Sequence, residues 1–219
     1  MLEVAVKIVL AYLVGDILGG DVLRRLMGGA DLRSSGSGNV GATNALRTRG
    51  KGFALGVLLI DVGKGVVAAL LIPHLPWPWS GASSWPVADL AYACGVAVAL
   101  GHCFPVFHGF RGGKGVATLA GVFASLLPLA FPWMLLVFVV AVLVYGYVAL
   151  ASLAGAVAAV VAVAVAPGIA TAAGAFALAM ALLVAVRHHV NIRRLLTGRE
   201  PRFERARLIG HWIDRCRGH

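Results

Sequence analysis

The sequence predicts an all-α integral membrane protein with seven transmembrane helices, an external N-terminus and a cytoplasmic C-terminus. The first observation is composition: 60% of the 219 residues are hydrophobic and 13% are charged, whereas roughly 25% are charged in a typical soluble domain. The second is that residues 115–186 contain no Asp, Glu, Lys, Arg or His. The third is an uneven distribution of Lys and Arg among the loops. These observations exclude an ordinary soluble domain.

The first three crossings come from separate apolar segments. A helix needs about 20 apolar residues to cross the hydrocarbon core of a bilayer. Three segments in the N-terminal half have this length, and they lie near residues 2–20, 52–73 and 87–107.

The stretch 115–186 provides the other four crossings. Two crossings would leave each helix too long, whereas four crossings of about 18 residues fit the expected range. Turn-forming residues divide the stretch at three places: Pro128 with Pro132, residues 146–152, and Pro167 with Gly168.

The distribution of cations tests this count. With seven crossings, one side receives Arg24, Arg25, Arg33, Arg47, Arg49, Lys51, Arg111, Lys114 and the arginines from Arg187 to Arg217. The loops of the other side receive no Lys or Arg, and only Lys7 lies near the N-terminus on that side. Because cytoplasmic loops are rich in Lys and Arg, the cationic side is predicted to be cytoplasmic. Trp77, Trp79 and Trp85 in the second external segment are typical of an interfacial belt.

We expect residues 1–219 to form a single polytopic membrane domain, with residues 192–219 as a basic amphipathic cytoplasmic tail. Helical spacing places Ile209, Trp212, Ile213 and Cys216 on one face of that tail. Such a helix is suited to the anionic inner leaflet of a membrane.

The first cytoplasmic loop, residues 32–52, is rich in glycine, hydroxyl and amide side chains and is flanked by Arg and Lys. Glycines allow successive backbone N–H groups to converge on an anion, and guanidinium groups bind phosphate oxygens. The alternative is a flexible linker, but a linker requires neither the cations nor the amides. The loop is therefore predicted to bind phosphate.

The second cytoplasmic loop, residues 101–118, contains Arg111-Gly112-Gly113-Lys114-Gly115 where a new helix begins. The N–H groups and the dipole of that helix would favour an anion beside Lys114. The spacing is not that of a nucleotide-binding P-loop, because Gly115 follows the lysine. His102 and His108 are more simply explained as packing or capping residues.

A third polar region, Arg187–Arg194, follows the last apolar segment and continues to Glu200. The adjacent pair His188 and His189 could suggest a metal, but consecutive residues of a helix point apart and no Cys or carboxylate lies at ligand spacing. No metal site is expected.

Two ionisable residues, Asp61 and Lys64, lie within an apolar segment. At positions i and i+3 of a helix they can form an ion pair, and intramembrane charges also mark functional sites. Both interpretations stay open at this point. Asp16 in the first segment has no evident partner.

Four blocks, GSGNVGATN followed by Arg47, LLIDVGKG, GHCFPVFHGFRGGKGVAT and HHVNIRRLLTGRE, resemble in sequence and order the bacterial acyl-phosphate:glycerol-3-phosphate acyltransferases, the PlsY family. The resemblance extends from Tyr12 to Glu200. It departs at Val40, Gly146 and Arg111, where the family usually has Pro, Arg and Lys, respectively.

The resemblance implies transfer of a fatty acyl group from acyl phosphate to the 1-hydroxyl of sn-glycerol 3-phosphate, giving lysophosphatidate and phosphate. Acyl phosphate carries its own leaving group, so a covalent nucleophile is not required. Positioning and charge stabilisation would supply much of the acceleration. The implied location is the bacterial cytoplasmic (inner) membrane, with the site facing the cytoplasm.

The predicted catalytic residues are Lys114, His188 and Asn191. The predicted substrate-binding residues are Ser37, Gly38, Asn39, Thr43, Asn44, Arg47, Lys51, Arg111, Gly112, Gly113, Gly115, Ser152, Arg194 and Glu200. The resemblance places Ser152 on a cytoplasmic loop, Asn191 at the reacting centre, and Glu200 where it fixes an arginine or the loop. His188 and a substrate phosphate oxygen are competing acceptors of the hydroxyl proton.

The expected partners are acyl phosphate, glycerol 3-phosphate and membrane lipid. No cofactor and no nucleic acid are expected, and a monomer is compatible with the sequence. The alternative from another class is a transporter or exchanger of a phosphorylated metabolite. Transporter sites lie near the bilayer midplane between inverted repeats, whereas the polar residues here collect on one side. A purely structural membrane subunit fits the polar loops least.

Overall fold

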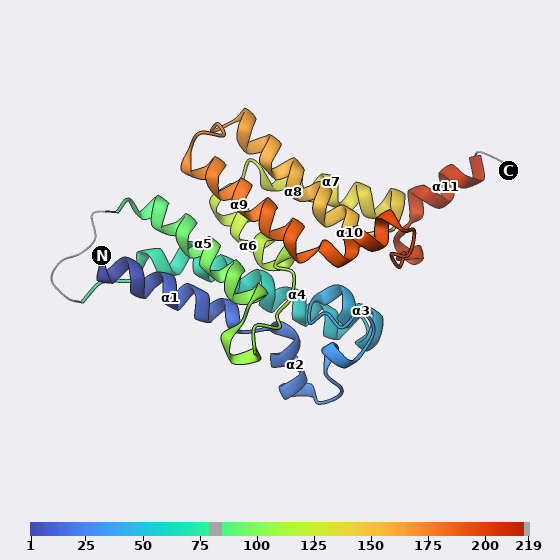
Figure 1. The fold of residues 1–219 in the computed structure, drawn as a ribbon, viewed down its shortest axis with the longest axis horizontal. Helices are drawn as coiled ribbons and strands as arrows, with labels where there is room; N and C mark the ends of the chain where they lie inside the picture. Colours follow the sequence, from blue (N-terminus) through green and yellow to red (C-terminus); the bar gives the residue numbers. More distant parts are fainter. Residues whose placement is uncertain (79–84, 217–219) are drawn as a thin grey trace. The chain divides into compact units, whose positions relative to one another are not determined.

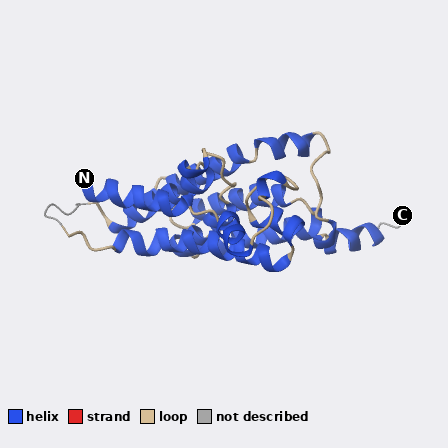
Figure 2. Ribbon diagram, turned by 90° about the horizontal axis from the view of Figure 1, so that it is seen from below, coloured by secondary structure: helices blue, strands red, loops and turns tan. Residues whose placement is uncertain are grey.

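The computed structural model describes residues 1–78 and 85–216, and every regular element in these ranges is helical (Figures 1 and 2). Trp79 and Arg217 lie outside the described residues. The chain forms two compact units, Met1–Leu127 and Pro128–His219. Each unit is described by itself.

In its described residues, the first unit contains six α-helices. They are α1 (Leu2–Asp16), α2 (Gly19–Met27), α3 (Ala42–Arg49), α4 (Lys51–Val66), α5 (Val87–Cys103) and α6 (Val116–Leu126). A π-helical segment, Val67–Leu71, and a 3₁₀ turn, Ile72–His74, extend α4, and two further 3₁₀ turns lie at Leu32–Ser34 and Val106–His108. Because α4 is lengthened in this way, its apolar stretch runs from Lys51 to His74.

Glycines allow the helices of the first unit to approach closely. A Cβ atom on Gly101 of α5 would overlap the carbonyl oxygen of Tyr12 in α1, and one on Gly65 of α4 would overlap that of Thr118 in α6. Small residues at helix crossings are typical of membrane proteins, where backbone proximity and packing replace the hydrophobic effect between helices. The pairs α1–α5 and α4–α6 therefore form the core of this unit (Figure 1).

The second unit contains the remaining helices. They are α7 (Phe131–Tyr145), α8 (Val148–Val165), α9 (Ala172–Arg187), α10 (His189–Leu196) and α11 (Leu208–Cys216), with a 3₁₀ turn at Glu204–Ala206. The helix α8 packs against both α7 and α9, and α11 contacts α7.

The three predicted breaks between the apolar helices are confirmed. Pro132 lies in the first turn of α7, where its missing N–H costs nothing. Gly146 ends α7 with a positive φ of 74°, and Thr171 caps α9 by accepting a hydrogen bond from the N–H of Gly174. These are local effects of Pro, Gly and Thr, so the sequence could locate them.

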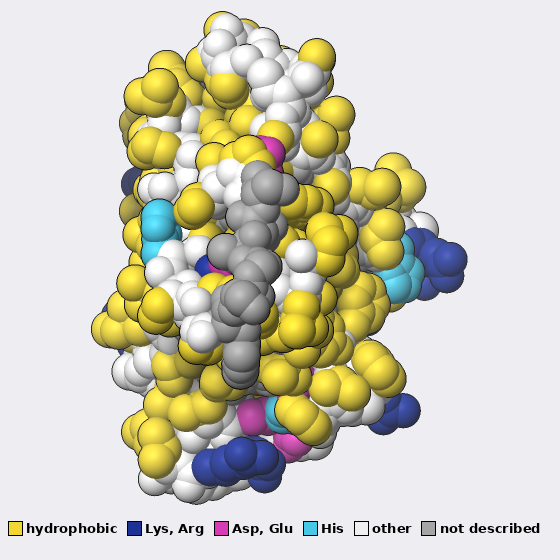
Figure 3. Space-filling model, turned by 90° about the vertical axis from the view of Figure 1, so that its left-hand side faces the viewer, with side chains coloured by type: hydrophobic (Ala, Val, Ile, Leu, Met, Phe, Trp, Pro, Cys, Tyr) yellow, Lys and Arg dark blue, Asp and Glu magenta, His cyan; other side chains and the backbone are white. Residues whose placement is uncertain are grey.

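Three helical stretches of the described residues are long and apolar enough to cross a membrane, and a fourth is added if the bent pair α9–α10 counts as one. They are Lys51–His74, Val87–His108, Val148–Val165 and Ala172–Arg187 with His189–Leu196. Helices α6 and α7 are apolar but shorter. Hydrophobic side chains dominate the face drawn in Figure 3. The predicted total of seven crossings stays a prediction.

Three boundaries differ from the expectation. The first apolar helix ends at Asp16 instead of continuing to residue 20, because the chain turns there and Gly19 begins α2. The first glycine-rich loop includes a helix, α3. Ser152 lies inside α8, with its hydroxyl donating to the carbonyl of Val148, and so is not on a loop.

Candidate functional site

Asn44 holds the first glycine-rich loop together. Its side chain is 1% exposed, and its Nδ2 lies 2.9 Å from the carbonyl oxygens of Leu32 and Asn39 and 3.0 Å from that of Ser35. Its Oδ1 accepts the N–H of Ser37 at 2.9 Å. The amide that sequence analysis assigned to substrate binding is therefore occupied by the loop backbone. The loop gains a defined shape from it.

This arrangement leaves other predicted residues at the surface of the loop. Ser37 and Gly38 are exposed, whereas Asn39 and Thr43 are half-buried. Gly38 has a positive φ of 72°, a conformation that glycine adopts without strain. The hydroxyl and amide side chains of this turn can therefore meet a ligand from solvent.

The cations beside this loop differ in their surroundings. Arg49 donates to the carbonyl oxygens of Gly28 (2.7 Å) and Ala30 (3.3 Å), so it is used in folding. Arg47 on α3 and Lys51 at the start of α4 are exposed. Of these three cations, Arg47 and Lys51 have the exposed charged groups that can bind an anion.

Arg33 connects the two glycine-rich loops. Its Nη1 and Nη2 donate to the two carboxylate oxygens of Asp21 at 2.8 and 2.9 Å, and its Nε and Nη2 lie 3.3 Å from the carbonyl oxygen of Arg111. Hydrogen bonding to Asp21 raises the pKa of Arg33 above its usual range. The loop after α2 and the loop before α6 are therefore adjacent in the first unit.

His108 of the second loop extends this cluster. Its Nε2 lies 3.1 Å from Asp21 and its Nδ1 lies 3.6 Å from Asp16. The backbone N–H of Phe107 donates to Asp16 at 3.4 Å. Asp16, which had no evident partner in the sequence, thus faces residues about ninety positions later, which no local pattern could indicate.

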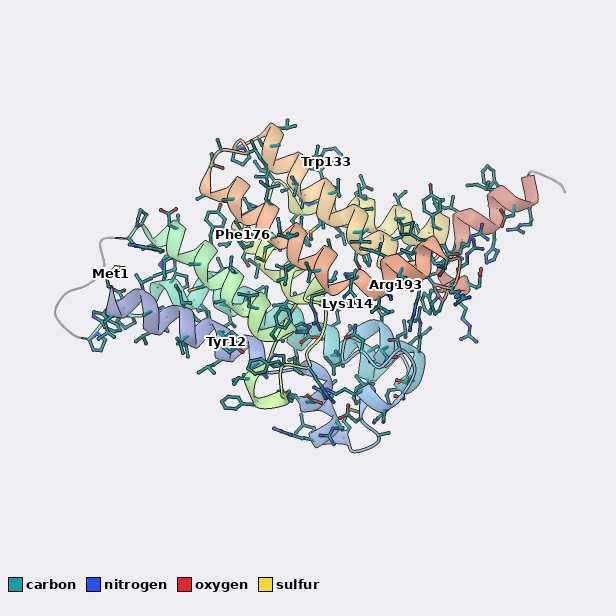
Figure 4. The ribbon with its side chains drawn as sticks, viewed as in Figure 1. Met1, Tyr12, Lys114, Trp133, Phe176 and Arg193 are labelled. Carbon is teal, nitrogen blue, oxygen red and sulfur yellow. The ribbon has the colours of Figure 1, made fainter. Side chains whose placement is uncertain are left out.

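The Arg111–Gly115 turn packs against the C-terminal end of α5. The N–H of Gly113 donates to the carbonyl oxygen of His102 at 3.0 Å, and a Cβ on Gly112 or Gly113 would overlap that carbonyl or the His102 ring, respectively. Gly115 precedes α6 with a φ of 80°. Lys114, half-buried, therefore lies on a tight turn at the start of a helix (Figure 4), as predicted.

A buried ionic cluster lies next to this turn and includes His102, which the turn contacts. Lys64 Nζ lies 3.1 Å from Asp61 Oδ1 and 2.7 Å from His102 Nδ1, and it donates to the carbonyl oxygens of Gly15 and Ile17. All three ionisable side chains are buried. Of the two interpretations left open for Asp61 and Lys64, the structure shows the ion pair, and it adds His102 as a partner that sequence analysis missed.

In the second unit, His188 lies at the 63° bend between α9 and α10. The side chain is 2% exposed, and Nδ1 lies 2.8 Å from the carbonyl oxygen of Val184. A carbonyl is only an acceptor, so Nδ1 carries a proton. His189, the next residue, is exposed.

Asn191 and Glu200 form a pair. The amide Nδ2 of Asn191 donates to Glu200 Oε1 at 2.7 Å. Glu200 was expected to fix an arginine or the loop, and the hydrogen bond that the structure shows is the one to Asn191. The second carboxylate oxygen, Oε2, is buried without a hydrogen-bond partner among the described residues. Arg194 is exposed on α10.

The predicted residues thus form two groups. The first unit gathers the glycine-rich loops with Arg47, Lys51 and Lys114, and the second gathers Ser152, His188, Asn191, Arg194 and Glu200. Within the described ranges, no group of three or more His, Cys, Asp or Glu is arranged to hold a metal. The chemistry that these groups offer is binding of anions and proton transfer.

Comparison with known proteins gives a consistent result. A family model described as "Glycerol-3-phosphate acyltransferase" matches residues 5–198. The glycerol-3-phosphate acyltransferase of Syntrophotalea carbinolica is 41% identical over 199 residues, which are 91% of this chain and 97% of that protein. The glycerol-3-phosphate acyltransferase of Cereibacter sphaeroides is 49% identical over 197 residues, which are 89% and 90% of the two chains.

Solved structures show the same similarity. The crystal structure of PlsY (YgiH), an integral membrane glycerol 3-phosphate acyltransferase, in its glycerol 3-phosphate form matches with a TM-score of 0.78 and 36% identity. The match covers 91% of this chain and 95% of that chain. The lysophosphatidic acid form of that protein matches with the same TM-score and identity.

Proposed function

This chain belongs to the glycerol-3-phosphate acyltransferase family, and from that premise we propose that it acylates the 1-hydroxyl of sn-glycerol 3-phosphate with acyl phosphate as donor. The hydroxyl oxygen attacks the acyl carbonyl carbon, the bond from that carbon to the phosphate oxygen breaks, and the hydroxyl proton passes to a base. The products are lysophosphatidate and inorganic phosphate. This reaction begins phospholipid synthesis.

The structural observation that carries the proposal is the pairing of two glycine-rich, cationic loops through Arg33. The guanidinium group binds Asp21 and the carbonyl of Arg111, so the two loops belong to one surface. Each substrate of the proposed reaction carries a phosphate group. Two adjacent loops that carry cations and polar side chains match that requirement.

Lys114 and its neighbouring glycines are assigned to glycerol 3-phosphate. The N–H groups at the start of α6 favour an anion, and the lysine supplies a positive charge. The relative in the glycerol 3-phosphate form supports this substrate. Ser37, Asn39, Thr43, Arg47 and Lys51 of the other loop are assigned to the acyl phosphate, with Asn44 shaping that loop.

The second unit is assigned to the reacting centre. His188, whose Nδ1 donates to the carbonyl of Val184, is the protein's candidate acceptor of the hydroxyl proton, in competition with a phosphate oxygen of the substrate. Asn191 is assigned to stabilising the charge that develops on the carbonyl oxygen. Glu200 orients Asn191.

The chain has the all-helical fold of an integral membrane protein. We place it in the bacterial inner membrane with seven crossings, an external N-terminus and the site facing the cytoplasm. The support is the concentration of Lys and Arg on one side of the predicted helices. Acyl phosphate could then enter laterally from the bilayer, while glycerol 3-phosphate arrives from the cytoplasm.

The experiment supplies purified protein in lipid with radiolabelled glycerol 3-phosphate and, in parallel, palmitoyl phosphate, palmitoyl-CoA or palmitoyl carrier protein. We expect lysophosphatidate from palmitoyl phosphate alone. Product from palmitoyl-CoA instead would contradict the proposed donor. No product from any donor, with protein shown to be folded, would contradict the proposed reaction and make uptake by proteoliposomes the next assay.

A further inference from the structure

The chain after α10 folds back onto the end of α7. The backbone N–H of Phe203 donates to the carbonyl oxygen of Gly146 at 2.7 Å, and Arg207 Nε donates to that of Val144 at 3.2 Å. The last carbonyls of a helix have no partner within the helix, so these two donors satisfy groups that α7 leaves open. A cation at a helix C-terminus is also favoured by the helix dipole.

Two further contacts strengthen this attachment. Arg202 Nε donates to the hydroxyl oxygen of Tyr147 at 2.7 Å, and its guanidinium group lies 5.0 Å from the centre of the same ring. A Cβ atom on Gly210 of α11 would overlap the carbonyl oxygen of Val144, so α11 meets the end of α7 without space for a side chain. We call Arg202, Phe203, Arg207 and Gly210 the C-terminal clasp.

Glu200 lies between two fixed points of the backbone. Just before it, the N–H of Arg199 donates to the carbonyl oxygen of Arg194 at 2.7 Å, which ties the chain to α10. Two residues after it, the C-terminal clasp begins. Pro201 restricts the conformation of the residue that precedes it, which is Glu200 itself. The clasp therefore restricts the position of the Glu200 carboxylate. That carboxylate accepts a hydrogen bond from the Asn191 amide.

The clasp lies beyond the region shared with the family model, which matches residues 5–198. Sequence analysis assigned the tail to the membrane surface and gave residues 201–219 no part in the site. Three exposed apolar side chains of α11, Leu208, Ile209 and Trp212, are compatible with that location. The contacts with Val144, Gly146 and Tyr147 are a separate property of the same segment.

We propose that the C-terminal clasp positions Glu200, and through it the Asn191 amide, for acyl transfer. The inference rests on the proposed function, because Asn191 acts there at the reacting centre. An amide that donates one N–H to a fixed carboxylate has its remaining groups held in a defined direction. Small displacements of a catalytic group are costly, on the order of a hundredfold in rate for 1 Å. Arg202 and Gly210 are thus positioning residues.

The test compares single variants of the full-length protein. Arg202→Ala and Gly210→Val, which loosen the two ends of the clasp, should each lower kcat about fivefold or more and leave KM for glycerol 3-phosphate within about twofold. Arg202→Lys should recover part of the loss, because an ammonium can still donate to the Tyr147 hydroxyl. Arg205→Ala is the matched control: Arg205 is an exposed arginine of the same segment, and its kcat should equal that of wild type.

A double-variant experiment separates positioning from general damage. In protein that already carries Asn191→Ala, adding Arg202→Ala should cause no further loss of kcat, because the clasp acts through Asn191. Losses that multiply would overturn the proposal, and so would a wild-type kcat in both clasp variants. If Gly210→Val fails to fold, Tyr147→Phe replaces it, since that change removes only the hydroxyl acceptor.

Hydrogen exchange provides a readout that does not depend on activity. Amides of residues 189–200 should exchange faster in Arg202→Ala than in Arg205→Ala, because the segment has lost one of its two attachments. Equal exchange would overturn the clasp even in an active enzyme. A wild-type protein without acyltransferase activity but with the expected exchange would instead contradict the proposed function and leave the clasp standing.

Discussion

Lys114 carries its positive charge on a turn whose shape is set by glycines and not by the lysine itself. The turn packs through Gly112 and Gly113 against His102, so replacing the side chain of Lys114 should leave the backbone in place. A hydrogen bond to a charged group is worth about 1.5–3 kcal/mol. We therefore expect Lys114→Ala to raise KM for glycerol 3-phosphate about 10- to 100-fold, measured by initial rates at saturating acyl phosphate.

Lys114→Arg retains the charge and serves as the control for this prediction. It should recover part of the affinity. An unchanged KM and kcat in Lys114→Ala would remove the Arg111–Gly115 turn from the substrate site. A loss of folded protein in the membrane would instead show that the lysine is structural.

Asn191 should affect turnover and not substrate affinity. Its amide is held by Glu200, and loss of a donor that stabilises a developing oxyanion typically lowers kcat by about 10²- to 10³-fold. We expect Asn191→Ala to lower kcat in this range with a normal amount of protein in the membrane. If turnover is normal, Asn191 is only a structural partner of Glu200.

The hydrogen-bond partners of Asn44 could not be predicted from the sequence. The pattern of amides, hydroxyls and glycines predicted the right loop, because those residue types and their spacing are local. The pattern could not show that the Asn44 amide faces three carbonyl oxygens of its own loop while Ser37 and Gly38 remain exposed. Which groups face inward and which remain exposed depends on the backbone conformation of the chain between Leu32 and Asn44.

At the level of helices, the buried pair Asp61–Lys64 should be essential for stability. Lys64 joins α4 to the end of α1 through the carbonyl oxygens of Gly15 and Ile17, and to α5 through His102. Removing one partner leaves a buried charge uncompensated, which costs about 3–5 kcal/mol. We expect Asp61→Ala to lower the free energy of unfolding by this amount, measured by thermal or denaturant unfolding in detergent.

Two controls define the origin of that loss. Asp89→Ala removes an exposed carboxylate near the start of α5 and should change stability little. The double variant Asp61→Ala with Lys64→Met removes both charges and should be more stable than Asp61→Ala alone. If the double variant is the less stable of the two, the pair does not act as a compensated ion pair.

The helices themselves were largely predictable, for local reasons. Pro132, Gly146 and Gly168 mark boundaries through their own backbone chemistry, so the breaks were found where expected. The polar helix α3 was missed because its eight residues show no apolar periodicity that separates a helix from a loop. The end of α1 at Asp16 was missed because no proline marks it and the apolar sequence continues.

At the scale of the whole molecule, composition and charge predicted an all-helical membrane protein, but not the contacts between distant segments. Arg33 with Arg111 and Lys64 with His102 join residues 78 and 38 positions apart. No periodic pattern relates such pairs. The first builds the paired loops of the candidate site, so the part of the site that sequence analysis missed is the part that depends on tertiary folding.

Topology is the remaining whole-molecule prediction, and single cysteines test it. In a background with Cys216→Ser, the remaining native cysteines Cys94 and Cys103 are buried and should react slowly. His74→Cys and Ile169→Cys would lie outside, whereas Ser34→Cys and Arg205→Cys would lie in the cytoplasm. These four positions are exposed.

A maleimide that does not cross membranes should label the first two variants in intact spheroplasts and the last two only after permeabilisation. Ile169 lies in the stretch that has no ionisable residue, so its labelling reports on the crossings within that stretch. Four crossings between residues 115 and 186 place Ile169 outside and Arg205 inside, whereas three crossings place the tail outside. Labelling of Arg205→Cys in intact spheroplasts would therefore contradict the seven-crossing arrangement. Protection of both Ser34→Cys and Arg205→Cys would put the first glycine-rich loop and the C-terminal clasp on the side where glycerol 3-phosphate is supplied.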